Sequence, residues 1–217
     1  GAGITGLSAA RILKKNGFED FVLLEMEHHF GGNSSNGENQ YSKFPLGAHY
    51  LPIPNKADEE LKAFLKESEI YLRDNENGEP VFAEYQLIFA PEERLFLKNE
   101  WQENLIPQYA TSEKVKAEFQ KFFSLMEDYR KKKDAEDKFW FDIPIKNAST
   151  TDEVKSLEKI TFKTWLVEHH FQSQELFWYL DYCCKDDFGL GTDFVSAWAG
   201  IFYFSARKND WSKQYDG

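Results

Sequence analysis

The chain has few cysteines and a shortage of cations, and each shortage excludes a class of protein. Its two cysteines, Cys183 and Cys184, are neighbours. Adjacent cysteines rarely bond to each other because the geometry is strained, so no disulfide framework is expected. The 26 lysines and arginines are outnumbered by 37 aspartates and glutamates, which gives the 217 residues a formal net charge of −11. An acidic chain without a basic stripe repels phosphates, so nucleic acid is not an expected partner.

Long apolar runs are also missing. No stretch approaches the ~20 consecutive apolar residues that a membrane-spanning helix needs, so no transmembrane segment is expected. The longest candidate, residues 194–206, is shorter and is interrupted by Ser196 and Gly200. We expect it to be a buried helix or strand. The densest basic run, residues 130–133, is followed at once by acidic residues and indicates a solvated helix end.

What the chain does have is a glycine fingerprint at its start. Gly1, Gly3 and Gly6 form the pattern G-x-G-x-x-G, and apolar residues follow at helical spacing from Leu7 to Leu13. The first glycine permits a tight turn, the second lets the backbone approach a pyrophosphate, and the third lets the helix pack closely. The unpaired N–H groups and the positive dipole end of that helix would then face the phosphates.

The residues after the predicted helix support the same interpretation. Asn16-Gly17 is a helix stop, and residues 21–24 are a short apolar run typical of a buried parallel strand. The run ends at Glu25, nineteen residues after Gly6, close to the acidic position that binds the ribose hydroxyls in dinucleotide folds. Strand, helix and acid in this register predict a dinucleotide site rather than a chance glycine turn.

The segment after Glu25 resembles the flavin-containing amine oxidase superfamily. It reads Met26-Glu27-His28-His29-Phe30-Gly31-Gly32-Asn33-Ser34, and later Phe44-Pro45-Leu46-Gly47-Ala48-His49-Tyr50. Members of that superfamily have an acid, a Gly-Gly pair and a polar residue, then a short hairpin and a Leu-Gly-Gly or Leu-Gly-Ala turn beside the flavin. The spacing matches over residues 1–50. The His-His-Phe-Gly-Gly-Asn form, with Asp186-Asp187-Phe188-Gly189 further on, most resembles the spermidine dehydrogenase branch and its bacterial relatives.

The resemblance implies an α/β fold with two parts. Residues 1–50 would be the N-terminal part of an FAD-binding Rossmann-like domain of the glutathione-reductase type, and residues 51–217 an α+β substrate-binding or cap region. FAD would be the cofactor and a small-molecule amine, such as a polyamine, the substrate of an oxidoreductase. The implied cofactor residues are Gly1, Gly3, Gly6, Glu25, Gly31, Gly32, Asn33, Gly47, Ala48, His49 and Tyr50. His49 either contacts the flavin ring or supports the turn, and no catalytic residue is indicated.

One departure from the family pattern affects how phosphates would be bound. Many amine oxidases have arginine after Gly-Gly and another arginine two residues after the acid. Here those places hold Asn33 and Glu27, so phosphate contacts must depend more on backbone N–H groups. Because the chain begins on the first fingerprint glycine and shows none of the later FAD segments of the family, we expect an inactive fragment of a longer protein that does not hold FAD stably.

Two other functions remain open at this stage. One keeps the fold and changes the reaction, as in a carotenoid desaturase or isomerase-like flavoenzyme with an apolar tunnel. The other is a binding module without redox activity, which the missing arginine after Gly-Gly keeps under consideration.

Other motifs have structural explanations that compete with functional ones. The pairs His28-His29 and His169-His170 have diverging side chains and no accompanying zinc motif, so a metal site is not expected. Residues 187–189 read Asp-Phe-Gly, but no kinase catalytic loop precedes them. Asp186 and Asp187 either attract a cationic amine or form the exposed end of a helix capped by Gly189.

Local patterns predict several further elements. We expect a hairpin over residues 34–44 turning at Asn36-Gly37, and a helix capped by Asn55. A strand is expected at residues 70–72, a hairpin of residues 82–89 with 95–97, and a long helix from Ser112. Short helices are expected at residues 162–169 and 173–185. The core stripe of the long helix is predicted to be Val115, Phe119, Phe122, Phe123 and Met126.

Overall fold

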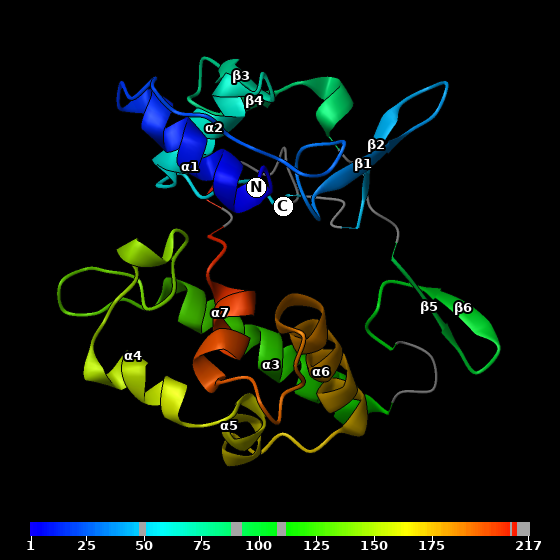
Figure 1. The fold of residues 1–217 in the computed structure, drawn as a ribbon. Coiled ribbons are helices and arrows are strands. Elements are labelled where there is room, and N and C mark those ends of the chain that lie inside the picture. Colours follow the sequence, from blue (N-terminus) through cyan, green and yellow to red (C-terminus); the bar gives the residue numbers. More distant parts are fainter. Residues whose placement is uncertain (48–50, 88–92, 108–111, 209, 212–217) are drawn as a thin grey trace. The chain divides into compact units, whose positions relative to one another are not determined.

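A computed structural model describes residues 1–47, 51–87, 93–107, 112–208, 210 and 211. The chain divides into two compact units, unit 1 (Gly1–Pro52) and unit 2 (Ile53–Gly217). Figure 1 shows the order of the elements along the chain. Strands in the described residues pair as three separate antiparallel hairpins, and most of the helical residues belong to unit 2. No helix in these ranges has the length and apolar character needed to cross a membrane.

Unit 1 opens with helix α1 (Ile4–Lys15), which confirms the predicted helix. Gly3 is its N-cap, with an extended backbone, and as a glycine it makes no side-chain cap bond to the first-turn N–H groups. Lys14 and Lys15 lie in the last turn, where cations suit the negative end of the helix dipole. The predicted stop is also confirmed, since Gly17 adopts φ 81°, a conformation that glycine reaches without strain.

The strand predicted for residues 21–24 does not form. No ladder among the described residues includes this run, and its four side chains are 38–82% exposed. A parallel strand that is apolar on both faces needs a neighbouring strand and a covering layer. In this part of unit 1 the structure has only an isolated parallel bridge, between Gly3 and Gly31. The apolar run therefore lies where the pattern placed it but lacks the partner that would make it a strand.

A hairpin of β1 (Ser35–Glu38) and β2 (Lys43–Leu46) follows, as predicted, but its turn is elsewhere. Asn39 makes the turn, because its Oδ1 accepts hydrogen bonds from the N–H groups of Tyr41 and Ser42 at 2.8 and 3.0 Å. Gly37 instead lies within β1 opposite Phe44. A Cβ on Gly37 would lie 2.4 Å from the Phe44 ring, so this glycine provides space for an aromatic ring and not a turn.

Unit 2 begins with a small cluster of its own. Helix α2 (Glu59–Glu67) packs against the hairpin of β3 (Tyr71–Asp74) and β4 (Pro80–Phe82), and the cluster's buried side chains are Leu65, Tyr71 and Phe82. The predicted cap was wrong. Asp58 caps α2 by accepting the N–H of Leu61 at 3.2 Å, and Asn55 has other partners, described below.

The next hairpin also differs from the prediction. Strand β5 (Arg94–Leu97) pairs with β6 (Glu100–Glu103) through Lys98 and Asn99, which both have positive φ, as a two-residue type I′ turn requires. Residues 84–86, expected in a strand, form a short 3₁₀ helix, and residues 88–92 lie outside the described residues. The proline at position 91 therefore does not mark the hairpin turn of the described strands.

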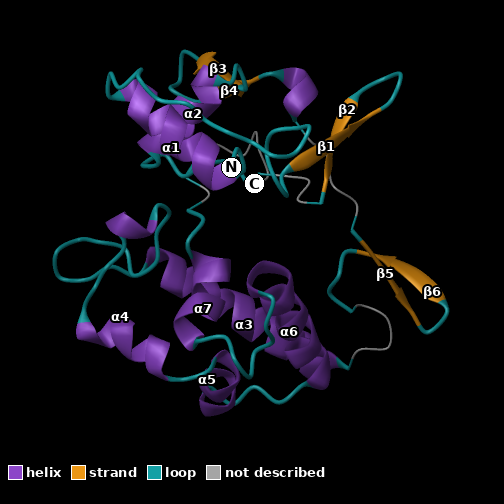
Figure 2. Cartoon of the chain, viewed as in Figure 1, coloured by secondary structure: helices purple, strands orange, loops and turns teal. Residues whose placement is uncertain are grey.

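The main core of unit 2 is helical (Figure 2). Helix α3 (Glu113–Lys131) packs against α6 (Gln174–Phe188) and α7 (Ala197–Ser205), and α7 also packs against α5 (Phe162–Glu168). A short helix, α4 (Asp152–Ser156), precedes α5. Ser112 caps α3, and four of the five predicted stripe residues are buried, with Phe123 packed at the edge of the core. The predicted short helices form as α5 and α6, and the predicted buried segment forms α7 over Ala197–Ser205, while Phe194 before it is exposed.

Two features of α6 and the loop after it follow from the sequence. Cys183 and Cys184 are free and buried, and burial raises the pKa of the two thiols to about 11 and about 12, so both stay protonated at neutral pH. Gly189 ends α6 in the left-handed conformation, as predicted. Two residues later the loop touches the helix again: a Cβ on Gly191 would lie 2.2 Å from the carboxylate of Asp181.

Candidate functional site

The fingerprint glycines differ in how closely the surroundings approach them. A Cβ on Gly6 would lie 1.9 Å from the carbonyl oxygen of Gly1, so α1 can lie against the opening segment only because this position has no side chain. A Cβ on Gly3 would meet nothing closer than Gly32 Cα at 3.9 Å. The backbone at Gly3 is therefore accessible from one side, next to the uncapped first turn of α1. Such a helix start is suited to an anion.

Glu25 folds back onto this glycine turn. Its Oε2 accepts the N–H of Ala2 at 2.5 Å, and its Oε1 accepts the N–H groups of Met26 and Glu27 at 2.8 and 3.0 Å. These backbone bonds, that of Glu27 first, hold the pKa of the Glu25 carboxyl below its usual value, while burial acts in the opposite direction. The result is an ionised carboxylate fixed beside Gly1, 3.6 Å from where a Cβ of that glycine would be.

A second glycine turn lies against the first. The N–H of Gly31 donates to Ala2 O at 2.8 Å, and Gly31 and Gly3 form the isolated parallel bridge. Gly31 and Gly32 have φ values of 104° and 60°, which other residues rarely adopt. A Cβ on Gly31 would lie 2.4 Å from Ser34 O. The Gly-Gly pair is therefore needed for this turn to reach the fingerprint.

Ala2 joins these parts, and the sequence reasoning did not identify it. Its N–H donates to Glu25, its carbonyl accepts from Gly31, and its side chain is fully buried. The only available signal was that the first variable position of the fingerprint is small. Gly1, Gly3, Gly6, Glu25, Gly31 and Gly32 thus come together as one group. Gly47 ends the hairpin with φ 107°, and Ala48, His49 and Tyr50 lie outside the described residues.

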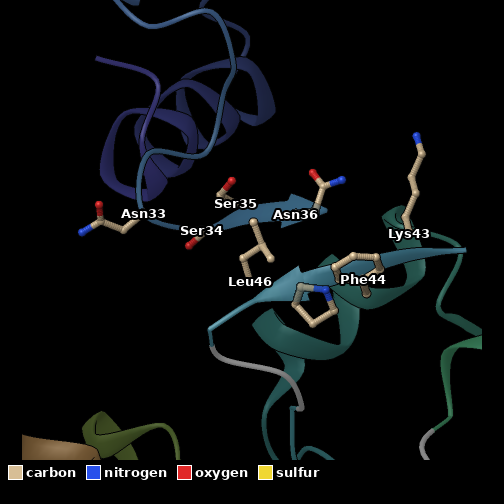
Figure 3. A pocket seen from close by; sticks show the side chains of 8 residues that line it. Asn33, Ser34, Ser35, Asn36, Lys43, Phe44 and Leu46 are labelled. Carbon is tan, nitrogen blue, oxygen red and sulfur yellow. The ribbon is translucent and has the colours of Figure 1, made fainter. Parts of the chain in front are cut away.

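Asn33 follows the second turn and lines a cavity of about 390 Å³ on the β1–β2 hairpin. Figure 3 shows Asn33 at one end of the group of side chains and Lys43 at the other, with Leu46 and Phe44 between them. Amide and hydroxyl groups of residues 33–36 line one side of this recess, and Lys43 with three apolar side chains of β2 lines the other. The full lining is Asn33, Ser34, Ser35, Asn36, Lys43, Phe44, Pro45 and Leu46. Lys43 was not identified from the sequence, where it is one of many lysines.

The two histidine pairs and the acidic pair Asp186-Asp187 lie in surroundings that fit the structural explanations given for them above. His28 and His29 are exposed, and the His169 ring stacks on Trp165 at 3.9 Å while its Nδ1 bonds to Trp165 O at 2.8 Å. No group of three or more histidines, cysteines or carboxylates in the described ranges could hold a metal ion. Asp186 and Asp187 are exposed near the end of α6.

Residues 1–68 match the model of a family described as an NAD(P)-binding Rossmann-like domain. No curated protein matches the chain. Two solved structures of putrescine oxidase are similar: a triple mutant from a redesign of cofactor binding, with a TM-score of 0.56, and the wild type bound to putrescine, with a TM-score of 0.55. Each is 18% identical and covers 93% of this chain.

These likenesses confirm the predicted fold class. The chain is an α/β protein whose first 68 residues match a Rossmann-like family model and whose fold is like that of putrescine oxidase. It spans 39% of the length of the two putrescine oxidase chains.

Proposed function

We propose that this chain belongs to an FAD-dependent oxidoreductase that oxidises an amine, with polyamines as the substrate class. The observation that carries the proposal is the placing of Glu25. Its ionised carboxylate is tied to Ala2 and lies beside Gly1, at the glycine turn that leads into an uncapped helix N-terminus. A ribose acceptor and a pyrophosphate-binding turn are the two parts that an adenine dinucleotide requires. The fold shared with putrescine oxidase supports an amine as the substrate.

The residues present fit FAD. Gly1, Gly3 and Gly6 would hold the pyrophosphate through backbone N–H groups, and Glu25 would accept hydrogen bonds from the ribose hydroxyls. Gly31, Gly32 and Asn33 would lie near the phosphates or the flavin, and residues 47–50 near the ring. Because Asn33 carries no charge, the backbone and the dipole of α1 would provide most of the favourable field for the phosphates.

This assignment gives the two parts of the chain different roles. Residues 1–50 would be part of the cofactor-binding domain, and residues 51–217 part of the substrate-binding region. When bound, FAD would supply the acceptor for a hydride from the α-carbon of the neutral amine, and water would hydrolyse the imine product. The spermidine dehydrogenase branch is the subgroup that we propose. Nothing in the geometry favours a carotenoid-type flavoenzyme.

The decisive experiment is an absorbance spectrum of the complete protein that contains this chain, followed by anaerobic addition of putrescine or spermidine. We expect a flavin spectrum that bleaches with the amine. A colourless protein would refute the cofactor assignment and favour a binding module. A yellow protein that polyenes bleach and amines do not would refute the amine assignment alone.

A variant of Glu25 tests the carboxylate itself. Glu25→Ala removes the acceptor that is fixed at the glycine turn, and we expect the purified protein to retain roughly tenfold less FAD, from the loss of one or two hydrogen bonds to a charged group. Glu27→Ala is the matched control, because its backbone N–H contacts Glu25 while its side chain is exposed. Equal FAD retention by both variants would contradict the proposed role of Glu25.

A further inference from the structure

The first segment of unit 2 is bound to the last segment of that unit that the structure describes. Asn55, which is 4% exposed, donates from Nδ2 to Ala206 O at 2.9 Å. Its Oδ1 accepts the N–H of Lys208 at 2.8 Å. These bonds join residues that are 151 and 153 positions apart in the sequence. One amide side chain therefore connects the start of unit 2 to the end of α7.

The residues on either side of Asn55 reinforce this connection. The N–H of Lys56 donates to both carboxylate oxygens of Asp210 at 3.2 Å, and the indole N–H of Trp211 donates to Pro54 O at 2.6 Å. The Lys56 ammonium lies 4.8 Å from the centre of the Trp211 ring. Residues 54–56 and the described residues 206–208, 210 and 211 thus run together, and we call this pair of segments the neck.

Asn55 also ties the neck to a third segment. Its Nδ2 lies 3.2 Å from Asp142 Oδ1 and 3.2 Å from Ile143 O, so its two N–H groups serve three acceptors. A side chain without these donors and without the acceptor for Lys208 would leave several buried polar groups unpaired, each at a cost in free energy. No other residue type of this size offers two donors and an acceptor in one plane.

Lys208 fixes the other side of the neck. Its ammonium donates to Arg130 O at 2.9 Å, to Ser205 O at 3.4 Å and to Phe141 O. These carbonyls lie in the last turn of α3, at the end of α7 and next to Asp142. The neck is therefore attached to the helical core at α3 and at α7.

We propose that Asn55 is a latch that holds the two segments of the neck to each other and to the helical core, so that they open and close as a single element. In this arrangement the neck separates from the helical core in one step when the latch is removed, while the core stays folded. The proposal goes beyond the proposed function and does not depend on it. The competing explanation is that Asn55 is an ordinary buried polar residue, whose loss lowers the stability of all of unit 2 equally.

Native-state hydrogen exchange of the 217-residue chain separates the two explanations. In Asn55→Ala we expect the amides of Lys208 and Lys56, one in each segment of the neck, to exchange about tenfold faster or more, as the loss of one or more buried hydrogen bonds implies. Amides in the middle of α3 should keep their protection. Uniform acceleration across unit 2, or no change at Lys208 and Lys56, would overturn the latch.

Ser205→Ala is the matched control. Ser205 is fully buried and its hydroxyl donates to Met126 O at 3.2 Å, a side-chain bond that joins α7 to α3 and includes no residue of the neck, while the carbonyl that Lys208 contacts is unchanged by the substitution. Its loss should accelerate exchange in α3 and α7 at least as much as at Lys208. Selective acceleration at Lys208 and Lys56 in this variant as well would contradict the role of Asn55, because any core defect would then open the neck.

Asn55→Asp keeps the proposal testable if the alanine variant does not fold. The new carboxylate retains the acceptor for Lys208 but faces the Asp142 carboxyl, whose pKa burial already raises. We expect the neck to open at neutral pH and to regain protection on acidification, as one of the two carboxyls takes up a proton. Protection that does not change as the pH is lowered would overturn the latch.

Discussion

Gly6→Ala is the sharpest test of the glycine turn, because two effects of known sign oppose each other. Gly6 lies in α1, and alanine in a helix interior is favoured over glycine by up to about 1 kcal/mol. The added methyl group, however, would lie 1.9 Å from Gly1 O and 3.1 Å from Gly1 C. Real Cβ contacts essentially never fall below 3.0 Å, and the obstacle here is backbone that no side-chain rotation can move.

The clash decides the outcome. To clear Gly1 O, the start of α1 must move by more than 1 Å, and overpacking of this kind typically costs about 1–3 kcal/mol. We therefore expect the helix to be less protected despite the better propensity of alanine. A displacement near 1 Å at a binding turn can cost on the order of a hundredfold, so FAD affinity of the complete protein should fall by about that factor.

Gly3→Ala is the matched variant that separates an effect on helix α1 from an effect on FAD binding. A methyl group there meets only Gly32 Cα at 3.9 Å, so α1 should keep its amide protection. It would still stand where the backbone is proposed to approach the pyrophosphate, so FAD affinity should fall. Hydrogen exchange of α1 and flavin fluorescence titration measure the two quantities separately. Wild-type protection and wild-type affinity in Gly6→Ala would refute the reasoning about both glycines.

Two further predictions concern charges in unit 2. Glu118 accepts the N–H groups of Gln172 and Ser173 at 2.9 and 2.8 Å, and although burial opposes its ionisation, these bonds lower its pKa overall. Glu118→Gln should cost about 1 kcal/mol in urea unfolding at pH 7. Because the folded pKa is depressed, the stability difference between the wild type and Glu118→Gln should close as the pH falls through it, below 4.5; a difference that persists in acid would count against this role of Glu118. Burial lowers the pKa of Lys208 from 10.5 to about 8, so between these values the unfolded chain binds more protons and stability should rise with pH. Relative to Lys208→Gln, the wild type should gain about 1 kcal/mol in urea unfolding between pH 7.5 and pH 10, allowing for solvent screening, and a falling difference would contradict this.

The helices were predictable because their signals are local. In α3 the apolar stripe and the capping serine lie within one segment, so the pattern contains what the fold uses. Gly17 and Gly189 were predictable for the same reason, since each lies within two residues of the end of its helix.

Turns and polar side chains with distant partners were not predictable. Asn36-Gly37 has the strongest hairpin signal in the chain, yet Gly37 provides space for the Phe44 ring on the neighbouring strand. Asn55 is of a residue type that commonly caps helices, yet its main partners lie more than eighty residues away in the sequence. Residues 21–24 have the pattern of a buried strand, which pairs only if a neighbour is present.

Some parts of the candidate site were predictable from the sequence and others were not. The spacing of the three glycines and Glu25 predicted that they belong together, and the structure brings them within contact of one another through Ala2. Their role in binding FAD stays a prediction, as does the role of Gly47, Ala48, His49 and Tyr50. The recess containing Lys43 could not be anticipated, because it depends on the register of the hairpin.

The buried side chains are distributed very unequally along the chain. Both apolar clusters consist of residues from unit 2, whereas Ala2 is the sole buried apolar residue among those described in unit 1. The heat-capacity change on melting scales with the apolar surface exposed, so a calorimetric trace of this chain would report almost entirely on unit 2. A ligand search at the glycine turns should therefore use a probe placed in unit 1 itself.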